Sequence, residues 1–424
     1  MSDFKFYIRF GVHKDREVIK LLRDSISGVV VPAHILCYST DATIAALSYI
    51  NRGYFIDPMS FIFADSRKIQ EYIVLDKKTQ KNTFKPSIHK LANNYGILEV
   101  FQNNGFSALK VSDFTEDFVR NFCKKNIELQ SQKFDQGKVN AYKKYEELLR
   151  KVGEEHIANE MKTVHSPNVI IPPYFYFDRL DDEWLDINLK LARRTKENTV
   201  LPVVPLIFVH PALVNEELLD KYTGFDEIFI WVDDLEKKNS LSVKQLTDFA
   251  SFVKLATARG VKVTNLYGSY FSVLLGKLGL EGMCNGVFYG ESKGRTSKVG
   301  GVPQSRYYVR TLHEFFPIPS TIELLKKFPA LLDKESLECM KIIDSNIENI
   351  FKFSDNHALA QAHFVLSRGK EIDDAKNKNL TLLLQELEGI YETYRKPISE
   401  SEEITDKNIE YLKYWKEAIR LAIE

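Results

Sequence analysis

Four acidic residues follow apolar runs of strand length, where their side chains could do acid–base or nucleophilic chemistry. Asp57 lies in YFIDPMSF, Asp178 ends PPYFYFD, Asp233 ends IFIWVDD and Glu291 ends GVFYGE. Carboxylates that share one edge of a sheet push each other's pKa values apart, so one can act as nucleophile and another as general acid. We predict a catalytic set of these four, led by Asp57 and Asp233. For Asp178, capping of the next helix is the alternative.

Two histidines also stand at the ends of apolar runs. His34 follows VVVPA and His210 ends VPLIFV. We assign His210 to the catalytic set and His34 to substrate binding, because an imidazole can act as a base or as a hydrogen-bond donor. A histidine satisfied within the core is the alternative for each.

A basic, glycine-rich segment follows the last apolar run, in NGVFYGESKGRTSKVGGVPQSRYYVRTLH. Its glycines allow a backbone to approach a ligand closely, and its cations and aromatic rings suit phosphate binding and base stacking. We predict an anion-binding site here, whereas a plain surface loop is the alternative. The predicted substrate-binding residues are His34, Tyr267, Tyr289, Lys293, Arg295, Lys298, Gly300, Gly301, Arg306 and Arg310.

The elements that must position these residues alternate between apolar runs and helical patterns, as in parallel βαβ units. The sequence contains neither a GxGxxG nor a GxxxxGK[ST] motif, the patterns that would indicate a doubly wound nucleotide-binding sheet. Eight such runs predict an α/β fold, a closed (β/α)8 TIM-type barrel whose strand ends carry function. The predicted strands span 4–12, 28–36, 54–64, 168–178, 200–210, 226–235, 261–268 and 282–292.

Two regions interrupt or extend this pattern. We predict a barrel over 1–320, with a mostly helical insertion at 65–166 after strand three, and a helical C-terminal region over 321–424. An insertion at that point would lie over the active face as a lid or pocket wall, with a packing extension as the alternative. The C-terminal helices could brace the barrel, which we favour, or bind a partner protein.

Composition narrows the function classes. The 58 basic and 58 acidic side chains cancel, which excludes a global basic field for nucleic acid. Four separated cysteines form no CxxC pair, and there is no signal-peptide pattern or apolar run long enough to cross a membrane. We therefore expect a cytoplasmic protein without membrane contact, and we predict neither a cofactor nor a bound metal.

The order of these features resembles that of the tRNA-guanine transglycosylase superfamily of barrels. The resemblance covers about residues 28–295 and rests on Asp57 in FIDPMSF and Asp178 in FYFD. The resemblance implies base-exchange chemistry. Because divergent members of that superfamily occur in prokaryotic DNA modification and antiphage systems, it also implies a role in a system of this kind. The chain departs from the family in three ways: it lacks the Cys/His zinc site, Pro58 and Met59 replace a glycine pair, and Glu291 is the nearest match to the nucleophile.

These patterns support a first hypothesis of an enzyme acting on a nucleobase, nucleotide or nucleic-acid substrate. Asp57 would recognise the base, Asp233 or Glu291 would act as nucleophile or base, and alanine at Asp57 or Asp233 would abolish activity without loss of stability. The second hypothesis is a catalytically silent barrel that binds a protein partner through its C-terminal helices. A metal-dependent hydrolase using His34, Asp57, His210 and Asp233 is a third.

Overall fold

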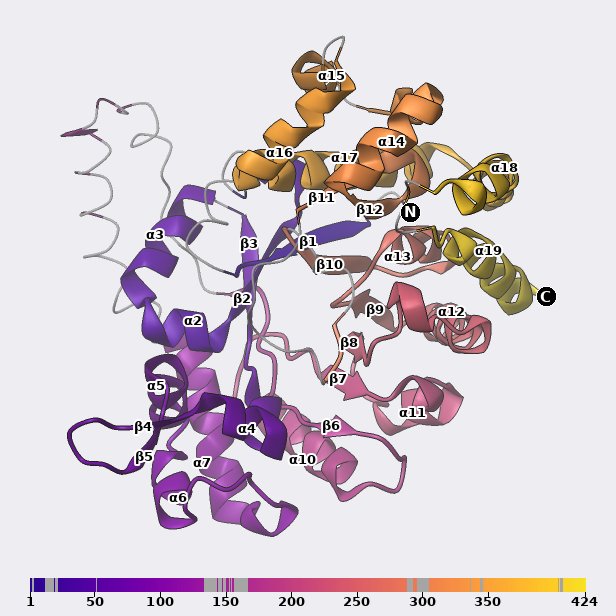
Figure 1. Cartoon of the computed structure of the whole chain (residues 1–424). Helices are drawn as coiled ribbons and strands as arrows, with labels where there is room; N and C mark the ends of the chain where they lie inside the picture. The colour runs from indigo at the N-terminus through magenta and orange to yellow at the C-terminus, as the bar shows by residue number, and fades with distance from the viewer. Residues whose placement is uncertain are drawn as a thin grey trace.

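Eight short apolar segments form one parallel sheet that curls around a common centre (Figure 1). Its spatial order is β3-β2-β1-β10-β9-β8-β7-β6, and every neighbouring pair runs parallel. Each of the eight predicted runs overlaps one of these strands, and seven contain their strand entirely, since β3 begins one residue before its run. The strands are β1 (Lys5–Arg9), β2 (Gly28–Pro32), β3 (Gly53–Asp57), β6 (Tyr176–Phe177), β7 (Leu206–Val209), β8 (Glu227–Val232), β9 (Lys262–Asn265) and β10 (Gly282–Gly286).

This computed structural model describes most of the chain. The described residues are 1, 4–11, 19, 22–50, 52–132, 143, 147, 150–151, 153, 155, 167–287, 293–295, 305–335, 337–343, 346–402, 404 and 407–424.

The prediction of a closed barrel is wrong, because the sheet is open. β3 and β6 are its two edges, and among the described residues no ladder joins them. The predicted fourth strand over 168–178 pairs with β7 only at Tyr176–Phe177, apart from one bridge between Ile170 and Val203. Pro172 and Pro173 contribute to this loss, since neither has an N–H to donate to a ladder.

Side chains take the place of a neighbouring strand along this fourth segment. Gln130 accepts from the Ile171 amide at 3.0 Å and donates to its carbonyl at 2.6 Å. Ser60 bonds both backbone groups of Tyr174, and Asn188 bonds both groups of Phe175. The backbone is therefore satisfied without strand pairing, as buried polar groups require.

Helices cover the outside of the sheet (Figure 1). The clearest is α12, which begins where the Ser242 side chain accepts from the Gln245 amide, ends before Gly260 at φ +76°, and buries one apolar face. The six outer helices are α2 (Ala33–Tyr38), α3 (Thr40–Ile50), α10 (Glu183–Glu197), α11 (Glu216–Lys221), α12 (Val243–Ala258) and α13 (Tyr270–Leu275).

The insertion after β3 is described over residues 65–132, and most of the rest of the predicted insertion, residues 133–166, lies outside the described residues. Its helix α7 packs against α10, so the insertion connects the two edges of the sheet. Its described elements are α4 (Ser66–Tyr72), β4 (Ile73–Leu75), β5 (Asn82–Phe84), α5 (Pro86–Asn94), α6 (Leu98–Asn103) and α7 (Glu116–Ile127).

The C-terminal region begins with an antiparallel hairpin and continues with helices. Helix α19 packs along α12, and the Lys254 amine of α12 donates to the Ala422 carbonyl at 3.2 Å. The last helix of the C-terminal region therefore packs against a helix that covers the sheet, as the bracing alternative expects. The elements are β11 (Arg306–Val309), β12 (Glu314–Pro317), α14 (Ile318–Lys327), α15 (Leu337–Ile343), α16 (Phe351–Asp355), α17 (His357–Asn377), α18 (Leu380–Glu400) and α19 (Glu410–Ile423).

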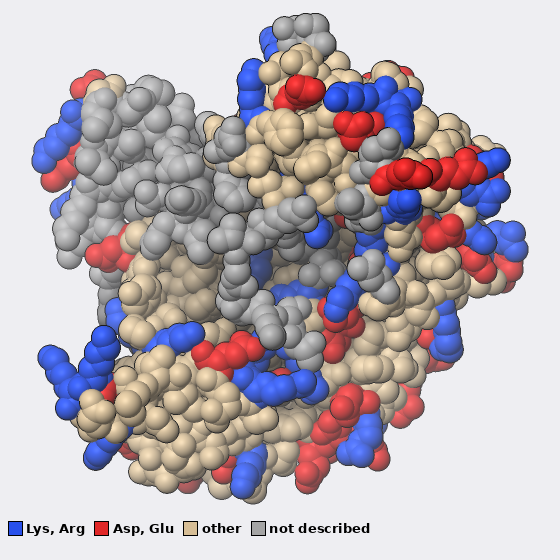
Figure 2. All heavy atoms as spheres, viewed as in Figure 1, with Lys and Arg blue, Asp and Glu red and all other residues tan. Residues whose placement is uncertain are grey.

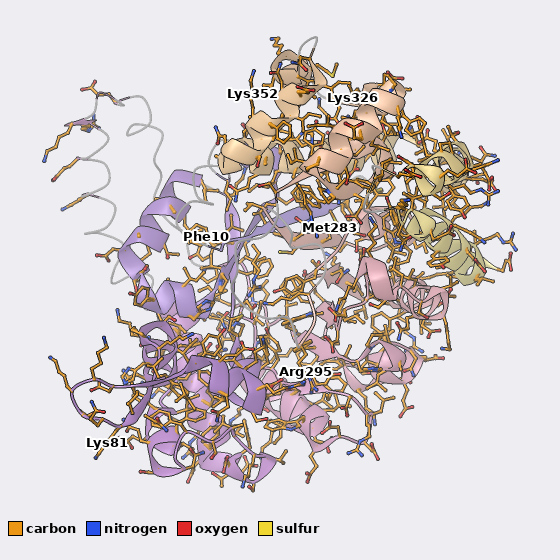
Figure 3. All side chains as sticks on the ribbon, viewed as in Figure 1. Phe10, Lys81, Met283, Arg295, Lys326 and Lys352 are labelled. Atoms are coloured by element: carbon orange, nitrogen blue, oxygen red, sulfur yellow. The ribbon has the colours of Figure 1, made fainter. Side chains whose placement is uncertain are left out.

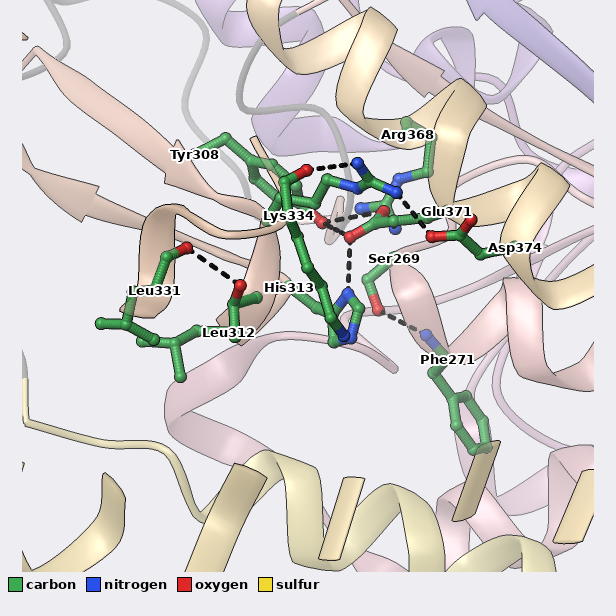
Figure 4. Close-up of polar contacts among 12 residues, drawn as sticks. Ser269, Phe271, Tyr308, Leu312, His313, Leu331, Lys334, Arg368, Glu371 and Asp374 are labelled. Atoms are coloured by element: carbon green, nitrogen blue, oxygen red, sulfur yellow. Dashed lines mark hydrogen bonds and ion pairs between the residues drawn. The ribbon is translucent and has the colours of Figure 1, made fainter. Parts of the chain in front are cut away.

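A buried polar network ties the hairpin to α17 (Figure 4). The Glu371 carboxylate, 2% exposed, pairs with Arg368 at 2.8 Å, accepts from the Tyr308 hydroxyl at 2.9 Å and contacts His313 Nδ1 at 2.5 Å. Burial raises the pKa of Glu371, but Arg368 and His313 outweigh it and lower the pKa overall. We call Tyr308, Arg310, His313, Arg368, Glu371 and Asp374 the C-terminal network.

No helix in the described part of the chain is long and apolar enough to span a membrane.

Candidate functional site

The segment after β10 crosses the carboxyl edge of the sheet and is fastened to the end of β8. The Trp231 indole donates to the Lys293 carbonyl at 2.7 Å, and the Arg295 amide donates to Asp233 Oδ1 at 2.5 Å. A Cβ at Gly294 would meet the Asp234 carboxylate, so a larger residue would push this segment away. These contacts therefore hold Lys293 and Arg295 in fixed places at this edge. We call Lys293, Arg295 and the side chains around them the edge site.

Lys293 places its amine among aromatic rings. Its Nζ lies 5.0 Å from the Trp231 ring centre and 5.3 Å from that of Tyr267, and it donates to the Tyr267 hydroxyl at 3.3 Å. Burial, and then the positive charge of Arg9, lower the pKa of Lys293 to about 7, although Asp57 opposes them. An amine with this pKa can gain or lose a proton near neutral pH, as acid–base groups of active sites do.

Asp57 is held in a closed set of contacts instead of facing a ligand. It is 1% exposed, and its Oδ2 lies 2.8 Å from Arg9 Nη1. Its Oδ1 accepts from the Met59 amide at 2.9 Å and from the Tyr174 hydroxyl at 2.8 Å. Burial would raise the pKa of Asp57, but Arg9 and these donors lower it, so the carboxylate stays ionised. Its role is to hold Arg9 in place.

His34 lies at the second position of α2, not at the end of a strand as predicted. Burial lowers its pKa to about 4, and the neighbouring charges of Arg9 and Lys293 add to this shift. Its Nδ1 is buried and has no hydrogen-bond partner among the described residues. With this pKa His34 is neutral near pH 7, so Arg9 and Lys293 are the cations beside the Asp57 carboxylate, and this local balance of charge favours an anion.

A cavity of about 290 Å³ opens beside Tyr176, at the end of β6. The Arg295 guanidinium lies 4.4 Å from the Tyr176 ring centre and 3.7 Å from Asp65, and Figure 3 shows Arg295 on the side of α4 and α10. Figure 2 shows Lys and Arg side chains in and around a hollow near the centre of this face. The cavity is lined by Phe61, Ala64, Asp65, Ser66, Arg67, Tyr176, Asp178, Asp182, Trp184 and Arg295.

Two predicted carboxylates act on this cavity. Asp178 lines it, and burial together with the charge of Asp233 raises the pKa of the Tyr176 phenol to about 12. Burial also raises the pKa of Asp233 itself, while the Arg295 amide opposes the shift. Asp178 in the lining and Asp233 beside it, the latter with a raised pKa, therefore both lie near the Tyr176 ring.

The other predicted residues are spread more widely. His210 caps a short 3-10 turn, with Nδ1 accepting from the Ala212 amide at 3.3 Å. Arg306 is exposed at the start of β11, and Arg310 belongs to the C-terminal network, 2.5 Å from Asp374, so it is not part of an anion-binding loop. Tyr289, Glu291, Lys298, Gly300 and Gly301 lie outside the described residues.

Several residues of the edge were missed by the sequence reasoning. Arg9 carries a signal that could have found it, because a charged residue within an apolar run must be paired or functional. Glu236 gave no such signal, yet its buried carboxylate accepts from the Ser269 amide at 2.8 Å, the Ser272 hydroxyl at 2.9 Å and Asn265 at 3.2 Å. Burial raises the pKa of Glu236 to about 7.

The sequence matches no protein-family model and no curated protein. The resemblance to the tRNA-guanine transglycosylase superfamily therefore stays a prediction.

Proposed function

We propose that this chain is an enzyme that binds a nucleotide or a nucleic-acid end at the carboxyl edge of its sheet and acts on the glycosidic bond. The observation that carries the proposal is Lys293, a half-buried residue whose amine lies among aromatic rings near the charge of Arg9 and has a pKa near 7. Such an amine suits a substrate with negative charge, whose binding would favour the protonated form.

The cavity beside Tyr176 supports a nucleobase and phosphate as the bound groups. Aromatic rings stack on bases without strong sequence preference, and an arginine forms paired hydrogen bonds with phosphate oxygens. Phe61, Tyr176 and Trp184 supply rings there, and Arg67 and Arg295 supply guanidinium groups. In this proposal the base stacks in the cavity and Arg295 binds the phosphate.

Asp178 and Asp233 support a reaction at the glycosidic bond. Such reactions use one carboxyl group that gives a proton and one that acts as nucleophile or base. Burial raises the pKa of Asp233, which suits the proton donor, and leaves Asp178 as the nucleophile or base. This assignment differs from the one expected from the sequence, in which Asp57 recognises the base and Asp233 or Glu291 is the nucleophile or base. Asp57 has no part in it, because it pairs with Arg9. Glycosyl exchange of the transglycosylase kind would use the same pair.

The test measures binding and base release with separate variants. Nucleoside 5′-monophosphates should bind more tightly than the matching nucleosides in calorimetry. Arg295→Gln should weaken nucleotide binding at least tenfold, which is about 1.4 kcal/mol, and Asp233→Asn should slow base release at least about 100-fold while binding is kept. Arg259→Gln is the control, since Arg259 pairs with Glu216 and Asp220 at the far end of α12.

The pH dependence gives a second readout. Since the amine is protonated below its pKa of about 7, nucleotide affinity should fall as pH rises from 6 to 8, and Lys293→Met should remove this dependence. Failure of every nucleotide to bind would refute the proposal. Binding without turnover would favour the catalytically silent alternative.

A further inference from the structure

A second group of side chains with ligand chemistry lies in the C-terminal region, on elements that do not form the edge site. Glu335 precedes α15, Cys339 lies on α15 and His363 on α17. Cys339 Sγ is 3.0 Å from His363 Nδ1, and Glu335 Oε2 is 3.7 Å from the same nitrogen. One donor atom from each residue lies within 4.8 Å of the other two. All three side chains are buried, that of Glu335 being 1% exposed.

The imidazole of His363 is fixed from its other side. Its Nε2 lies 2.8 Å from the Tyr308 carbonyl, and the Tyr307 ring stacks on it with centres 4.2 Å apart. Donation of the Nε2 proton to this carbonyl leaves the Nδ1 lone pair directed at Cys339 and Glu335. Histidines that bind metals show this second contact in most cases, because it sets the tautomer and the orientation of the ring.

The carboxylate of Glu335 lacks the partners that a buried charge requires. Within the described part of the chain neither of its oxygens accepts a hydrogen bond, and its Oε2 makes an ion-pair contact with the His363 ring, at 3.7 Å. Burial raises the pKa of Glu335. The charge of His363 lowers it, followed by the Arg310 amide and the Tyr307 hydroxyl, which lie nearby outside hydrogen-bond geometry. Since burial of an unsatisfied carboxylate is costly, a cation among the three donor atoms would remove a real penalty.

The arrangement does not suit a nucleophilic cysteine. In a Cys–His–acid relay the thiol and the acid contact opposite nitrogens of the imidazole. Here both face Nδ1, and Nε2 is taken up by the Tyr308 carbonyl. The three groups converge on one point, which is the geometry of a coordination site.

We propose that Glu335, Cys339 and His363 bind a Zn²⁺ ion that stabilises the C-terminal region. Thiolate, imidazole and carboxylate are the common zinc ligands, with bonds of about 2.0 to 2.3 Å. Tetrahedral geometry then places ligand atoms roughly 3.5 Å apart, and the separations of 3.0 and 3.7 Å lie on either side of that value. Water completes the fourth position. The ion joins α15 to α17 beside the hairpin strand β11.

The competing arrangement is a buried ion pair without metal. Burial lowers the pKa of His363, but Glu335 and Cys339 outweigh it and raise the pKa to about 9. A protonated His363 would then face an ionised Glu335, and Nδ1 would carry a proton in place of a metal bond. Metal content and ligand spectra separate the two arrangements.

The experiment uses the full chain, purified without a metal-affinity column or chelator. We expect about one zinc per chain by mass spectrometry, and X-ray absorption at the zinc edge should show one sulfur at about 2.3 Å with nitrogen and oxygen at about 2.0 Å. Cobalt exchange should give a thiolate-to-cobalt absorption band. Cys339→Ser should remove this band and weaken zinc binding at least tenfold. Cys123→Ser should change neither, because Cys123 is a buried cysteine that contacts the Leu191 carbonyl.

Chelation of the zinc should lower the melting temperature of the wild-type chain, and return of zinc should restore it. A protein that stays metal-free in excess zinc chloride would overturn the proposal, as would a cobalt band that survives in Cys339→Ser. If that variant does not fold, the X-ray absorption spectrum of the wild-type protein tests the proposal by itself. A sulfur atom at bonding distance from the zinc can come only from a bound cysteine.

Discussion

The edge site and the C-terminal network both bury charged side chains, but they balance those charges differently. In the C-terminal network each cation has its own carboxylate, Arg368 with Glu371 and Arg310 with Asp374. Burial lowers the pKa of His313, which favours its neutral form. At the edge site the charges around Lys293 are not paired one to one, because Lys293 and Arg9 both lie near the carboxylate of Asp57.

The difference separates a structural role from a functional one. Paired, hydrogen-bonded charges keep ordinary ionisation and fix one packing arrangement, and loss of either partner leaves the other stranded. Where buried charges of one sign are in excess, each disfavours the charged form of its neighbours, which moves their pKa values closer to pH 7. Such a place also favours a ligand of the opposite charge. Substitutions should therefore cost stability in the C-terminal network and binding at the edge site.

The largest expected loss of stability comes from Glu371→Gln. The change keeps the shape of the side chain but leaves buried Arg368 without its carboxylate, and such losses cost about 3 to 5 kcal/mol. Urea denaturation measures the free energy of unfolding. Asp373→Asn on the same helix is the control, since its exposed pair with Lys376 should contribute less than about 0.5 kcal/mol. Equal effects of the two changes would show that the network has no special weight.

Asp57→Asn should cost about 3 kcal/mol, because Arg9 would lose its carboxylate within the sheet. This expectation replaces the one drawn from the sequence, in which Asp57 is catalytic and dispensable for folding. Asp57 also opposes the lowering of the Lys293 pKa, so that pKa should fall further in the variant. The double variant Arg9→Met, Asp57→Asn should regain part of the lost stability. An Asp57→Asn chain as stable as the wild type would place Asp57 with the functional groups instead.

The smallest expected effect is the pH dependence of stability caused by Glu236. Its pKa is about 7 in the folded chain and about 4.3 when unfolded. The folded state thus holds its proton over a range where the unfolded state has lost it. The contribution of Glu236 is therefore complete below pH 4 and is lost as pH rises through 7.

Glu236→Gln, which resembles the protonated form, should match the wild type near pH 4. At pH 8 it should be more stable by roughly 1 to 3 kcal/mol. Thermal unfolding across this pH range measures the difference. Glu197→Gln, an exposed surface change, should follow the wild type throughout. A parallel pH profile for Glu236→Gln would mean that Glu236 does not titrate in this range.

Much of the sheet could be predicted from the sequence, because buried parallel strands read as apolar runs at regular intervals. The closure of the sheet could not. It depends on what bonds the backbone of residues 171–175, where Ile171, Tyr174 and Phe175 bond to side chains that are distant in sequence or on another element. These side chains belong to Gln130, Ser60 and Asn188. Only Pro172 and Pro173 gave a local warning.

The candidate site was predicted in part. Lys293 and Arg295 stand out in a basic segment, and Asp178 and Asp233 stand at strand ends as expected. The sequence could not show that Arg9 takes up Asp57, since the pair depends on the register of β1 beside β2 and β3. Nor could it show the group of Glu335, Cys339 and His363, because Cys339 and His363 lie on different helices and follow no short ligand motif.

The side chains that bond the fourth segment have a consequence for how this protein can change over evolutionary time. A ladder of backbone bonds survives almost any substitution, because every residue but proline carries the same N–H and carbonyl. The bonds from Ser60, Gln130 and Asn188 are each encoded by a single codon. One point mutation can remove one of these side-chain bonds. Selection can therefore weaken or strengthen the open side of the sheet by single substitutions.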